Sequence, residues 1–411
     1  MNDIFMCKRC FYTTMHPLKI TFNEQGICSG CIIHEEKNTL DWEYRFLKLK
    51  KIINKYQSKL NNVYDCIVPV TGANDSYFIV HVVKNILKLK PLLVHYNKHY
   101  NTSLGIRNLA NLRSKFDCDI YFQNINPILI KKITKETMSL LGSVYWHCLA
   151  GHTVYPVQVA EQMKIPLIIW GEHQGLQQVG MFSHKHEVEM TRRYRKDHDL
   201  MGHEPKDLVK ASNNLSIDDL YPYEYPSDKS INKIGIRGIY LGNYIRWDPI
   251  EQHNLMIKKF GYKSGSLSRT FDSYDYVDSY VYTGIHDKVK YLKHGYTKVT
   301  DHVCREIRYG RITKNQGAKL IKLFENRPDK FENLFTKWLG INSKGLKLFY
   351  NEIRNSIIWK EVEPNRWKKY YPRSNNKKDN KKEKKIENLY KVNSKINYKK
   401  EDQYIIFGKG V

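Results

Sequence analysis

A short apolar run that ends in a turn of small residues constrains the fold of this chain more than any other feature. Residues 65–70 (DCIVPV) have the composition of a buried strand, residues 71–76 read TGANDS, and residues 77–83 (YFIVHVV) can continue as a helix. The first N–H groups of a helix point outward and the helix dipole favours negative charge, so this arrangement can hold phosphate. The segment therefore predicts a nucleotide-phosphate site. A Walker-type loop is excluded, because no Gly-Lys-Ser/Thr follows at the required spacing.

The same turn also permits a plainer interpretation as an ordinary strand-to-helix connection. In that case Asp75 and Ser76 would cap the helix, since both residue types accept hydrogen bonds from the first backbone N–H groups. The turn alone leaves both interpretations open.

Further apolar runs alternate with segments of helical periodicity. Residues 91–96 (PLLVHY), 120–122 and 165–170 (IPLIIW) are the additional strand candidates. Strands that alternate with helices predict an α/β fold with a parallel sheet and right-handed crossovers. Ligands of such sheets bind beyond the carboxyl ends of the strands. We therefore expect the loops after Val70, Val94 and Trp170 to converge on one pocket.

Four cysteines form two C-x-x-C pairs near the start of the chain. Cys7 and Cys10 are the first pair, and Cys28 and Cys31 the second. Four thiolates on two tight turns suit a tetrahedral structural zinc ion, with an iron–sulfur cluster as the alternative. The other cysteines are scattered in mostly apolar surroundings, which indicates buried thiols rather than disulfides; they are Cys66, Cys118, Cys148 and Cys304.

The length of 411 residues and the distribution of charge indicate several units. The net charge of +26 would suit a nucleic-acid partner, but much of the excess lies in a Lys- and Asn-rich tail, so we do not expect one. No apolar run is long enough to span a bilayer and the start lacks a signal peptide, so we expect a cytoplasmic protein. The expected units are a zinc ribbon (1–40), an ATP-binding domain (41–235), a mainly helical domain with a polar working face (236–367) and a disordered basic tail (368–411).

Several motifs together resemble a known family. TGANDS resembles the SGGxDS loop of the PP-loop ATP pyrophosphatases, with Thr71 and Ala73 in place of the first Ser and the second Gly. The double C-x-x-C and three downstream blocks narrow the resemblance to the N-acetyl sugar amidotransferases of bacterial surface-polysaccharide and nonulosonic acid biosynthesis. The likeness extends from Cys7 to about Trp367, and its downstream blocks are LGNYIRWDP (241–249), RTFDSYDYVD (269–278) and IHDKVKYLKHGY (285–296).

The resemblance implies a PP-loop core of the adenine nucleotide alpha hydrolase-like type and an ATP-driven reaction. The acetamido oxygen of a sugar attacks the α-phosphate of ATP, pyrophosphate leaves, and ammonia displaces AMP to give an acetamidino group. No stretch of the sequence is left over for a glutaminase domain, and the chain starts Met-Asn, which does not suit an N-terminal nucleophile. The resemblance implies that a partner glutaminase, with a cyclase-like companion, supplies the ammonia.

The resemblance also implies roles for individual residues. Asp75 would hold Mg²⁺, because a bare carboxylate does not face phosphate favourably, and Ser76 would join it as a catalytic residue. Phosphate contacts would come from Thr71, Gly72, Ala73, Asn74 and Ser76. Adenine and ribose would lie against Val94, His95, Tyr96 and Asn97, and the sugar, metal or ammonia against Gly171, Glu172 and His173.

Candidates in the downstream blocks are less specific. Arg269 and Lys290, or Lys293, would stabilise the pyrophosphate. The acidic residues would bind sugar hydroxyls or a second Mg²⁺, or form ordinary salt bridges; they are Asp248, Asp272, Asp275 and Asp287.

Two other functions fit parts of the sequence. A tRNA-modifying PP-loop enzyme of the thiolation or lysidine type would suit the positive charge and the zinc ribbon. Thiolation would require a reactive cysteine at the ATP pocket, for which Cys148 and Cys66 are the candidates. A non-catalytic basic zinc-ribbon protein would suit the departures at Ala73 and Asn74.

Overall fold

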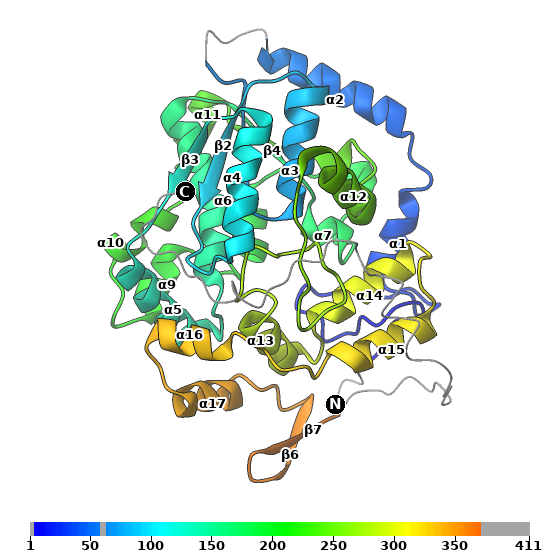
Figure 1. Ribbon diagram of the computed structural model, residues 1–411, viewed down its shortest axis with the longest axis vertical. Helices are drawn as coiled ribbons and strands as arrows, with labels where there is room; N and C mark the ends of the chain where they lie inside the picture. The colour runs from blue at the N-terminus through cyan, green and yellow to red at the C-terminus, as the bar shows by residue number, and fades with distance from the viewer. Residues whose placement is uncertain (1–3, 58–62, 371–411) are drawn as a thin grey trace.

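The central feature of the protein is a five-stranded parallel sheet with the strand order β3-β2-β1-β4-β5. The computed structural model describes residues 4–57 and 63–370 of the chain (Figure 1). All four strand pairings in this sheet are parallel, which confirms the predicted α/β class. The strands are β1 (Cys66–Pro69), β2 (Pro91–Tyr96), β3 (Ile120–Gln123), β4 (Leu167–Trp170) and β5 (Arg237–Tyr240).

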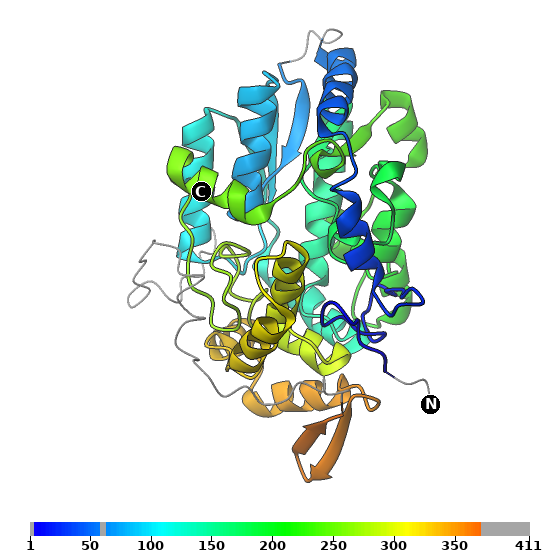
Figure 2. The same ribbon diagram turned by 90° about the vertical axis from the view of Figure 1, so that its right-hand side faces the viewer.

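Helices cover both faces of this sheet (Figures 1 and 2). Val68 and Ile169 belong to an apolar cluster that includes side chains of α2, α3, α4 and α12. Ile67 and Ile168, which alternate with them along the same strands, pack with side chains of α6 on the opposite face. The alternation explains why the strand sequences are apolar throughout. The bounds are α2 (Trp42–Gln57), α3 (Asn74–Val80), α4 (Ser103–Phe116), α6 (Trp146–Met163) and α12 (Pro249–Phe260).

The crossover helices begin and end at residues with the expected capping chemistry. Thr102 accepts a hydrogen bond from the N–H of Gly105 at the start of α4, and Asn126 accepts one from Ile128 at the start of α5 (Pro127–Leu141). Gly142 ends α5 with a φ of 58°. A π-helical turn, η1 (His81–Ile86), extends α3.

The N-terminal segment packs against the C-terminal helices rather than forming a separate appendage. Its cysteines share an apolar cluster with Val299 and Val303 of α14 (Lys298–Arg308) and Leu320 of α15 (Lys314–Phe324). The segment ends in α1 (Ser29–Glu36), and Figure 2 shows it running along the body of the protein. The four cysteines lie together, as predicted.

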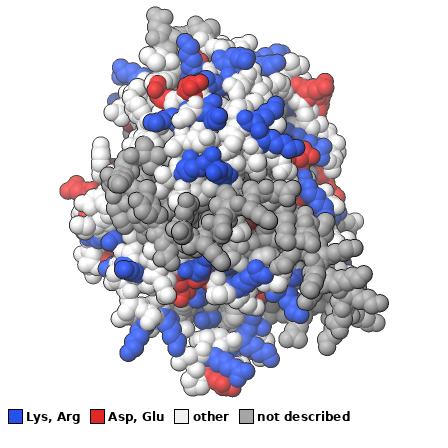
Figure 3. Space-filling view, viewed as in Figure 1, with Lys and Arg blue, Asp and Glu red and all other residues white. Residues whose placement is uncertain are grey.

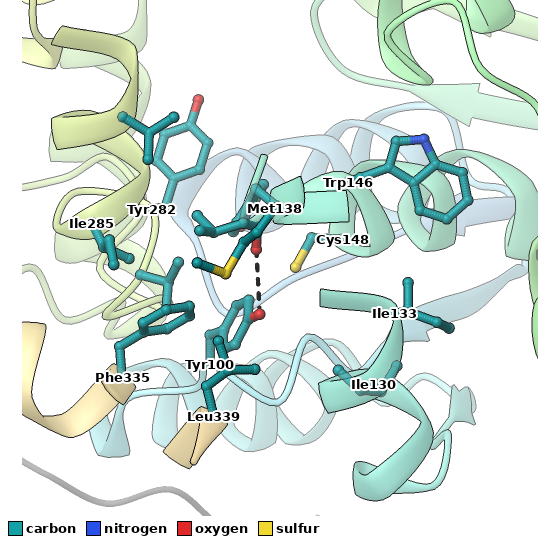
Figure 4. Close-up of a cluster of buried hydrophobic side chains, with 14 of the residues drawn as sticks. Tyr100, Ile130, Ile133, Met138, Trp146, Cys148, Tyr282, Ile285, Phe335 and Leu339 are labelled. Carbon is teal, nitrogen blue, oxygen red and sulfur yellow. Dashed lines mark hydrogen bonds between the residues drawn. The ribbon is translucent and has the colours of Figure 1, made fainter. Parts of the chain in front are cut away.

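The C-terminal region is mainly helical, as predicted, and lies beyond one end of the sheet (Figure 1). It shares its largest apolar cluster with the sheet domain. Figure 4 draws this cluster, in which Phe335 and Leu339 are grouped with Ile130 and Met138 of α5. The predicted boundary at residue 235 falls just before β5, which pairs with β4 in the sheet. The remaining elements are α13 (Ile285–His294), α16 (Glu332–Leu339), α17 (Ser343–Glu352), β6 (Trp359–Glu363) and β7 (Arg366–Lys369).

The charged segment between β4 and β5 folds back onto the protein as short helices. Leu208 and Leu220 are buried in the same cluster as Phe335, and the guanidinium of Arg195 donates to the carbonyl of Thr153 at 2.5 Å. The elements are α7 (Gln174–Gln177), η2 (His184–His186), α8 (Arg192–Tyr194), η3 (Arg195–Asp199), α9 (Pro205–Ala211), α10 (Ile217–Leu220), η4 (Tyr221–Tyr223) and α11 (Asp228–Ile234), with η5 (Leu241–Asn243) after β5.

The surface in Figure 3 carries Lys and Arg side chains scattered among fewer acidic ones.

Among the described residues, none of the helices combines the length and the apolar character that a membrane crossing requires. Most of the predicted basic tail, residues 371–411, lies outside the described residues.

Candidate functional site

The larger of the two cavities described here lies where the sheet, the N-terminal segment and α14 meet. Its volume is about 170 Å³, against about 30 Å³ for the second cavity. The sheet side contributes Asn74, Asp75 and Glu172 to the wall. The N-terminal segment contributes Tyr12, His34 and Lys37, and the C-terminal region contributes Asp275, Tyr276, Lys298, Asp301, His302, Arg305, Arg308 and Tyr309.

The turn after β1 is held by hydrogen bonds within itself. The N–H of Thr71 donates to the hydroxyl of Ser76 at 2.8 Å, and the N–H of Ala73 donates to the hydroxyl of Thr71 at 3.1 Å. The side chain of Asn74 lies 3.2 Å from the ring of His253, which fixes the first turn of α3. The two hydroxyls expected to contact phosphate thus also brace the turn.

The departure at Ala73 places no strain on the backbone. Ala73 precedes α3 with φ −86° and ψ 173°, an extended conformation that any residue adopts. Gly72 has a stricter role, because a Cβ there would overlap the backbone of Gly105 on α4. The close approach of these two backbones requires glycine at position 72.

Two carboxyl groups on the sheet side face the cavity without an ion-pair partner among the described residues. Asp75 lies in the first turn of α3, and Glu172 follows β4. Burial and the negative charge of Glu172 and Asp275 raise the pKa of Asp75 well above its usual range. Burial raises the pKa of Glu172 to about 7. Both carboxyl groups line the same cavity and resist ionisation, and a divalent cation bound there would stabilise their ionised forms.

The opposite wall is the polar face of α14, whose charged groups are already paired. Although burial opposes it, Lys298 and His302 lower the pKa of Asp275, which lies 3.0 Å from the His302 ring nitrogen. Arg305 donates to Asp272 at 2.5 Å and to Glu306 at 2.7 Å. These pairs give the wall a fixed pattern of charge.

Residues predicted to bind the nucleotide base lie mostly away from the main cavity. His95 and Asn97 line the second, smaller cavity together with Gly72, and the His95 ring bonds the carbonyl of Val70 at 2.9 Å. Tyr96 points into the core, where its hydroxyl bonds that of Tyr223 at 2.8 Å. The loops after Val70 and Trp170 therefore meet at the main cavity, while the loop after Val94 opens on the second.

The remaining candidates near β2 and β4 have packing roles. Val94, on β2, is buried in the apolar cluster that includes side chains of α6. Gly171 packs against Ile79 and Trp247, and His173 caps α7 by accepting from the N–H of Leu176.

The predicted cationic clamp lines neither described cavity. Arg269 is buried in an ion pair with Asp287 at 2.8 Å and donates to the carbonyls of Glu325 and Arg327. Lys290 pairs with Asp301, whose other oxygen accepts from Tyr12, so Lys290 reaches the cavity only through its partner.

The other charged candidates of the downstream blocks are also bound within the protein. Lys293 donates to the carbonyl of Leu141 at 2.9 Å. Asp248 caps α12 and pairs with Arg311. Asp275 alone of the four predicted acids lines the cavity.

The residues of α14 were not singled out by the sequence analysis. The pattern that could have indicated them is a polar row at helical spacing, with Lys298, Asp301, His302 and Arg305 at positions i, i+3, i+4 and i+7. Val299, Val303 and Cys304 occupy the opposite, buried face. The residues contributed by the N-terminal segment carry no such local pattern.

The four N-terminal cysteines have the geometry of a metal site. Their sulfur atoms all lie within 4.8 Å of one another, and those of Cys10 and Cys28 are 3.6 Å apart. Tetrahedral Zn–S bonds of about 2.3 Å place sulfurs roughly 3.8 Å apart. The N–H of Cys28 points at the Cys7 sulfur at 3.2 Å, and the Arg308 guanidinium lies 3.8 Å from the Cys28 sulfur. These donors would stabilise thiolates.

Comparisons with known proteins agree with part of the predicted family. Residues 268–373 match the family model described as LPS biosynthesis protein WbpG-like, C-terminal domain. A stretch of 121 residues, 29% of this chain, is 26% identical to an uncharacterized protein of Methanocaldococcus jannaschii, and covers 42% of that protein. The chain thus spans less than half the length of this relative.

Two solved structures share a distant likeness with the chain. One is an NH3-dependent NAD synthetase from Campylobacter jejuni (TM-score 0.28, 12% identity, 47% of this chain and 92% of that one). The other is an NMN synthetase from Francisella tularensis (TM-score 0.28, 14% identity, 56% and 98%). Similarity of this degree supports no inference about the reaction.

Proposed function

We propose that this protein is an AMP-forming, ATP-dependent amidotransferase that converts the N-acetyl group of a sugar to an acetamidino group. The family match of residues 268–373 supports a role in making a surface polysaccharide. The observation that carries the proposal is the cavity itself, in which Asp75 on α3 and Glu172 after β4 face the charged row of α14.

The reaction requires activation because an amide is a poor electrophile and its oxygen a poor leaving group. In the first step the acetamido oxygen bonds to the α-phosphorus of ATP, and the bond to the departing pyrophosphate breaks. In the second step ammonia adds to the imidate carbon, the C–O bond breaks, and AMP leaves with the former acetamido oxygen. The nitrogen gives up its extra proton, and the product is the amidine.

The residues of the cavity suit these steps. Asp75 and Glu172 would hold Mg²⁺, which would offset the charge of the phosphates. The guanidinium of Arg305 and the ammonium of Lys298 face the same space and would stabilise negative charge developing on the pyrophosphate. Their ion pairs hold both cations in place before the substrates bind.

We further propose that Cys7, Cys10, Cys28 and Cys31 bind a structural zinc ion. Four protein ligands leave no open coordination position, so the metal would support the fold and take no part in the chemistry.

An isotope-labelling experiment tests the reaction. The protein is incubated with ATP, Mg²⁺, ammonium and a panel of N-acetylated sugars that carry ¹⁸O in the acetamido group. We expect a product about one mass unit lighter than the unlabelled sugar, because NH replaces O, together with pyrophosphate and AMP that contains the ¹⁸O. ADP as the nucleotide product, or label retained in the sugar product, would refute the proposal.

We propose that a separate glutaminase, with its cyclase-like companion, delivers the ammonia. Ammonium should then support turnover best at alkaline pH, where more of it is the nucleophilic NH₃, and glutamine alone should not. Comparing the amidino product formed with ammonium, with glutamine, and with glutamine plus a partner glutaminase measures this. Efficient use of glutamine by the protein alone would overturn it.

The thiolation alternative receives no support from its two candidate cysteines. Cys148 and Cys66 are fully buried and line neither described cavity. Burial raises the pKa of both thiols, which disfavours the reactive thiolate.

A further inference from the structure

Lys37 is the one cavity-lining Lys or Arg, among the described residues, whose charged group has no carboxylate or sulfur partner. Only 3% of this residue is exposed, and its ammonium contacts the hydroxyl of Tyr309 at 3.5 Å. No carboxylate of the described residues lies within 4.0 Å of it. Burying an ammonium away from water is costly unless a counter-charge replaces the lost hydration.

The other cations of the cavity show the contrast. Lys298 lies 3.6 Å from Asp275, and Arg305 contacts two carboxylates. Arg308 donates to the carbonyl of Gln178 at 2.6 Å and lies beside the Cys28 sulfur. Their charges are satisfied within the protein, whereas that of Lys37 is not.

We propose that Lys37 binds an oxyanion of a ligand in this cavity, either a phosphate of the nucleotide or an acidic group on the sugar. The inference rests on the proposed function only in assigning substrates to this cavity. Burial lowers the pKa of Lys37 to about 8, so the group is still largely an ammonium at neutral pH. Two acids oppose that effect of burial on the pKa of Lys37: Glu172, across the cavity, more strongly, and Asp248 less so.

The position of Lys37 extends the role of the cysteine-containing segment. Lys37 is the C-cap of α1, which follows Cys28 directly and contains Cys31. His34 of the same helix packs edge-on against Tyr309, with ring centroids 4.5 Å apart. The metal expected at the cysteines would therefore fix the helix that presents Lys37 to the ligand.

Binding measurements without turnover test the proposal. Calorimetry would compare wild type with Lys37→Met for three probes: Mg²⁺-pyrophosphate, an N-acetylated sugar acid, and the matching uncharged N-acetylhexosamine. We expect Lys37→Met to weaken at least one of the two anionic probes tenfold or more and to leave the uncharged sugar unaffected. Loss confined to pyrophosphate identifies a phosphate of the nucleotide, and loss confined to the sugar acid identifies the acceptor.

Thermal midpoints of the ligand-free proteins give a second, independent readout. Lys37→Met should leave the midpoint unchanged or raise it, because it removes an unpaired buried charge. The matched control Lys98→Met should lower it, because it leaves Asp278 buried without its partner. Lys51→Met, at an exposed position, should change neither midpoint nor binding.

Unchanged affinity for both anionic probes, or a lower midpoint or failure to fold in Lys37→Met, would overturn the proposal and assign Lys37 a structural role. The result is independent of the reaction: absence of AMP formation would refute the proposed function while leaving a Lys37-dependent anion site intact.

Discussion

The two walls of the main cavity differ in whether their charged side chains form ion pairs within the protein. On the sheet side, Asp75 and Glu172 face the cavity without ion-pair partners among the described residues. On α14, Asp301 pairs with Lys290, and Arg305 with Asp272 and Glu306. The difference separates two kinds of role: the groups on the sheet side are available to a ligand, whereas the groups on α14 also hold the wall together.

The supports behind the two walls differ as well. Apolar side chains of several helices pack behind the strand that leads into the Asp75 turn. Behind α14 lies the cysteine-containing segment, where the N–H of Phe11 donates to the Cys304 sulfur at 3.4 Å. Changes to α14 should therefore destabilise the protein, and changes on the sheet side should affect chemistry.

Loss of the metal ligand set should have the largest effect on the α14 side. We expect Cys28→Ser to lose the roughly one zinc per chain of the wild type and to lower the thermal midpoint strongly, because structural zinc contributes on the order of 10 kcal/mol. Elemental analysis and thermal unfolding measure both quantities. The control Cys118→Ser, which lies outside the cluster, should retain the metal. A wild-type protein that contains no zinc and has the same thermal midpoint as Cys28→Ser would contradict the expectation.

Removing a paired cation from α14 should come next. Arg305→Met leaves the buried carboxylate of Asp272 without its guanidinium, so we expect a loss of about 3 kcal/mol or more in the free energy of unfolding. Urea denaturation measures the loss. Arg193→Met is the control, because its side chain is 93% exposed and should change stability little. Equal stability of Arg305→Met and wild type would remove the distinction between the walls.

Asp75→Asn should reverse that pattern. We expect AMP formation to fall by at least about 100-fold, equivalent to roughly 3 kcal/mol of transition-state stabilisation, because the proposed Mg²⁺ site would lose a charged ligand. Stability should be unchanged or slightly higher, since a carboxyl whose pKa burial has raised is costly to ionise. Pyrophosphate release and urea denaturation check the two parts, with exposed Asp117→Asn as the control. Near-normal turnover would exclude Asp75 from the chemistry.

The smallest expected effect is a pH dependence on the sheet side. The pKa of Glu172 is about 7 in the folded protein, against an ordinary value of 4.5, so the folded state binds more protons between these pH values. Wild type should therefore lose stability relative to Glu172→Gln as pH rises from about 4.5 to about 7. The loss should be at most about 3 kcal/mol, and solvent screening of the partly exposed side chain should make it smaller. Mg²⁺ should reduce the loss by stabilising the ionised form.

Unfolding measured across this pH range, with and without Mg²⁺, provides the check. If the difference between wild type and Glu172→Gln did not vary with pH, Glu172 would not titrate in this range. The unpaired character of the sheet side would then need another explanation.

The sequence indicated the parts of the site that depend on local pattern. The strand before Val70, the turn that contains Asp75 and the C-x-x-C pairs are all encoded within a few neighbouring residues. The sequence could not indicate in this way which Lys and Arg side chains line the cavity. Arg269 and Lys298 look alike in the sequence, and only the fold pairs Arg269 with the buried Asp287 while it turns Lys298 toward the cavity.

Long-range packing explains the other differences. Lys37 reaches the cavity because the cysteine-containing segment packs against the α14 region. The contact of Lys37 with Tyr309 joins residues 272 positions apart. The strand at Arg237–Tyr240 is too short and too mixed in composition to stand out, and it is defined by its pairing with β4.

The close backbone approach at Gly72 has a consequence for how the protein folds. A Cβ at Gly72 would overlap Gly105, and a Cβ at Gly105 would overlap Asp278, so three segments far apart in the sequence meet backbone to backbone. Contacts that close such long loops form slowly. We therefore expect the turn to reach its final shape late in folding, after the C-terminal region has docked. The cavity would then become able to bind a ligand only in the nearly complete molecule, and truncated chains would lack this ability.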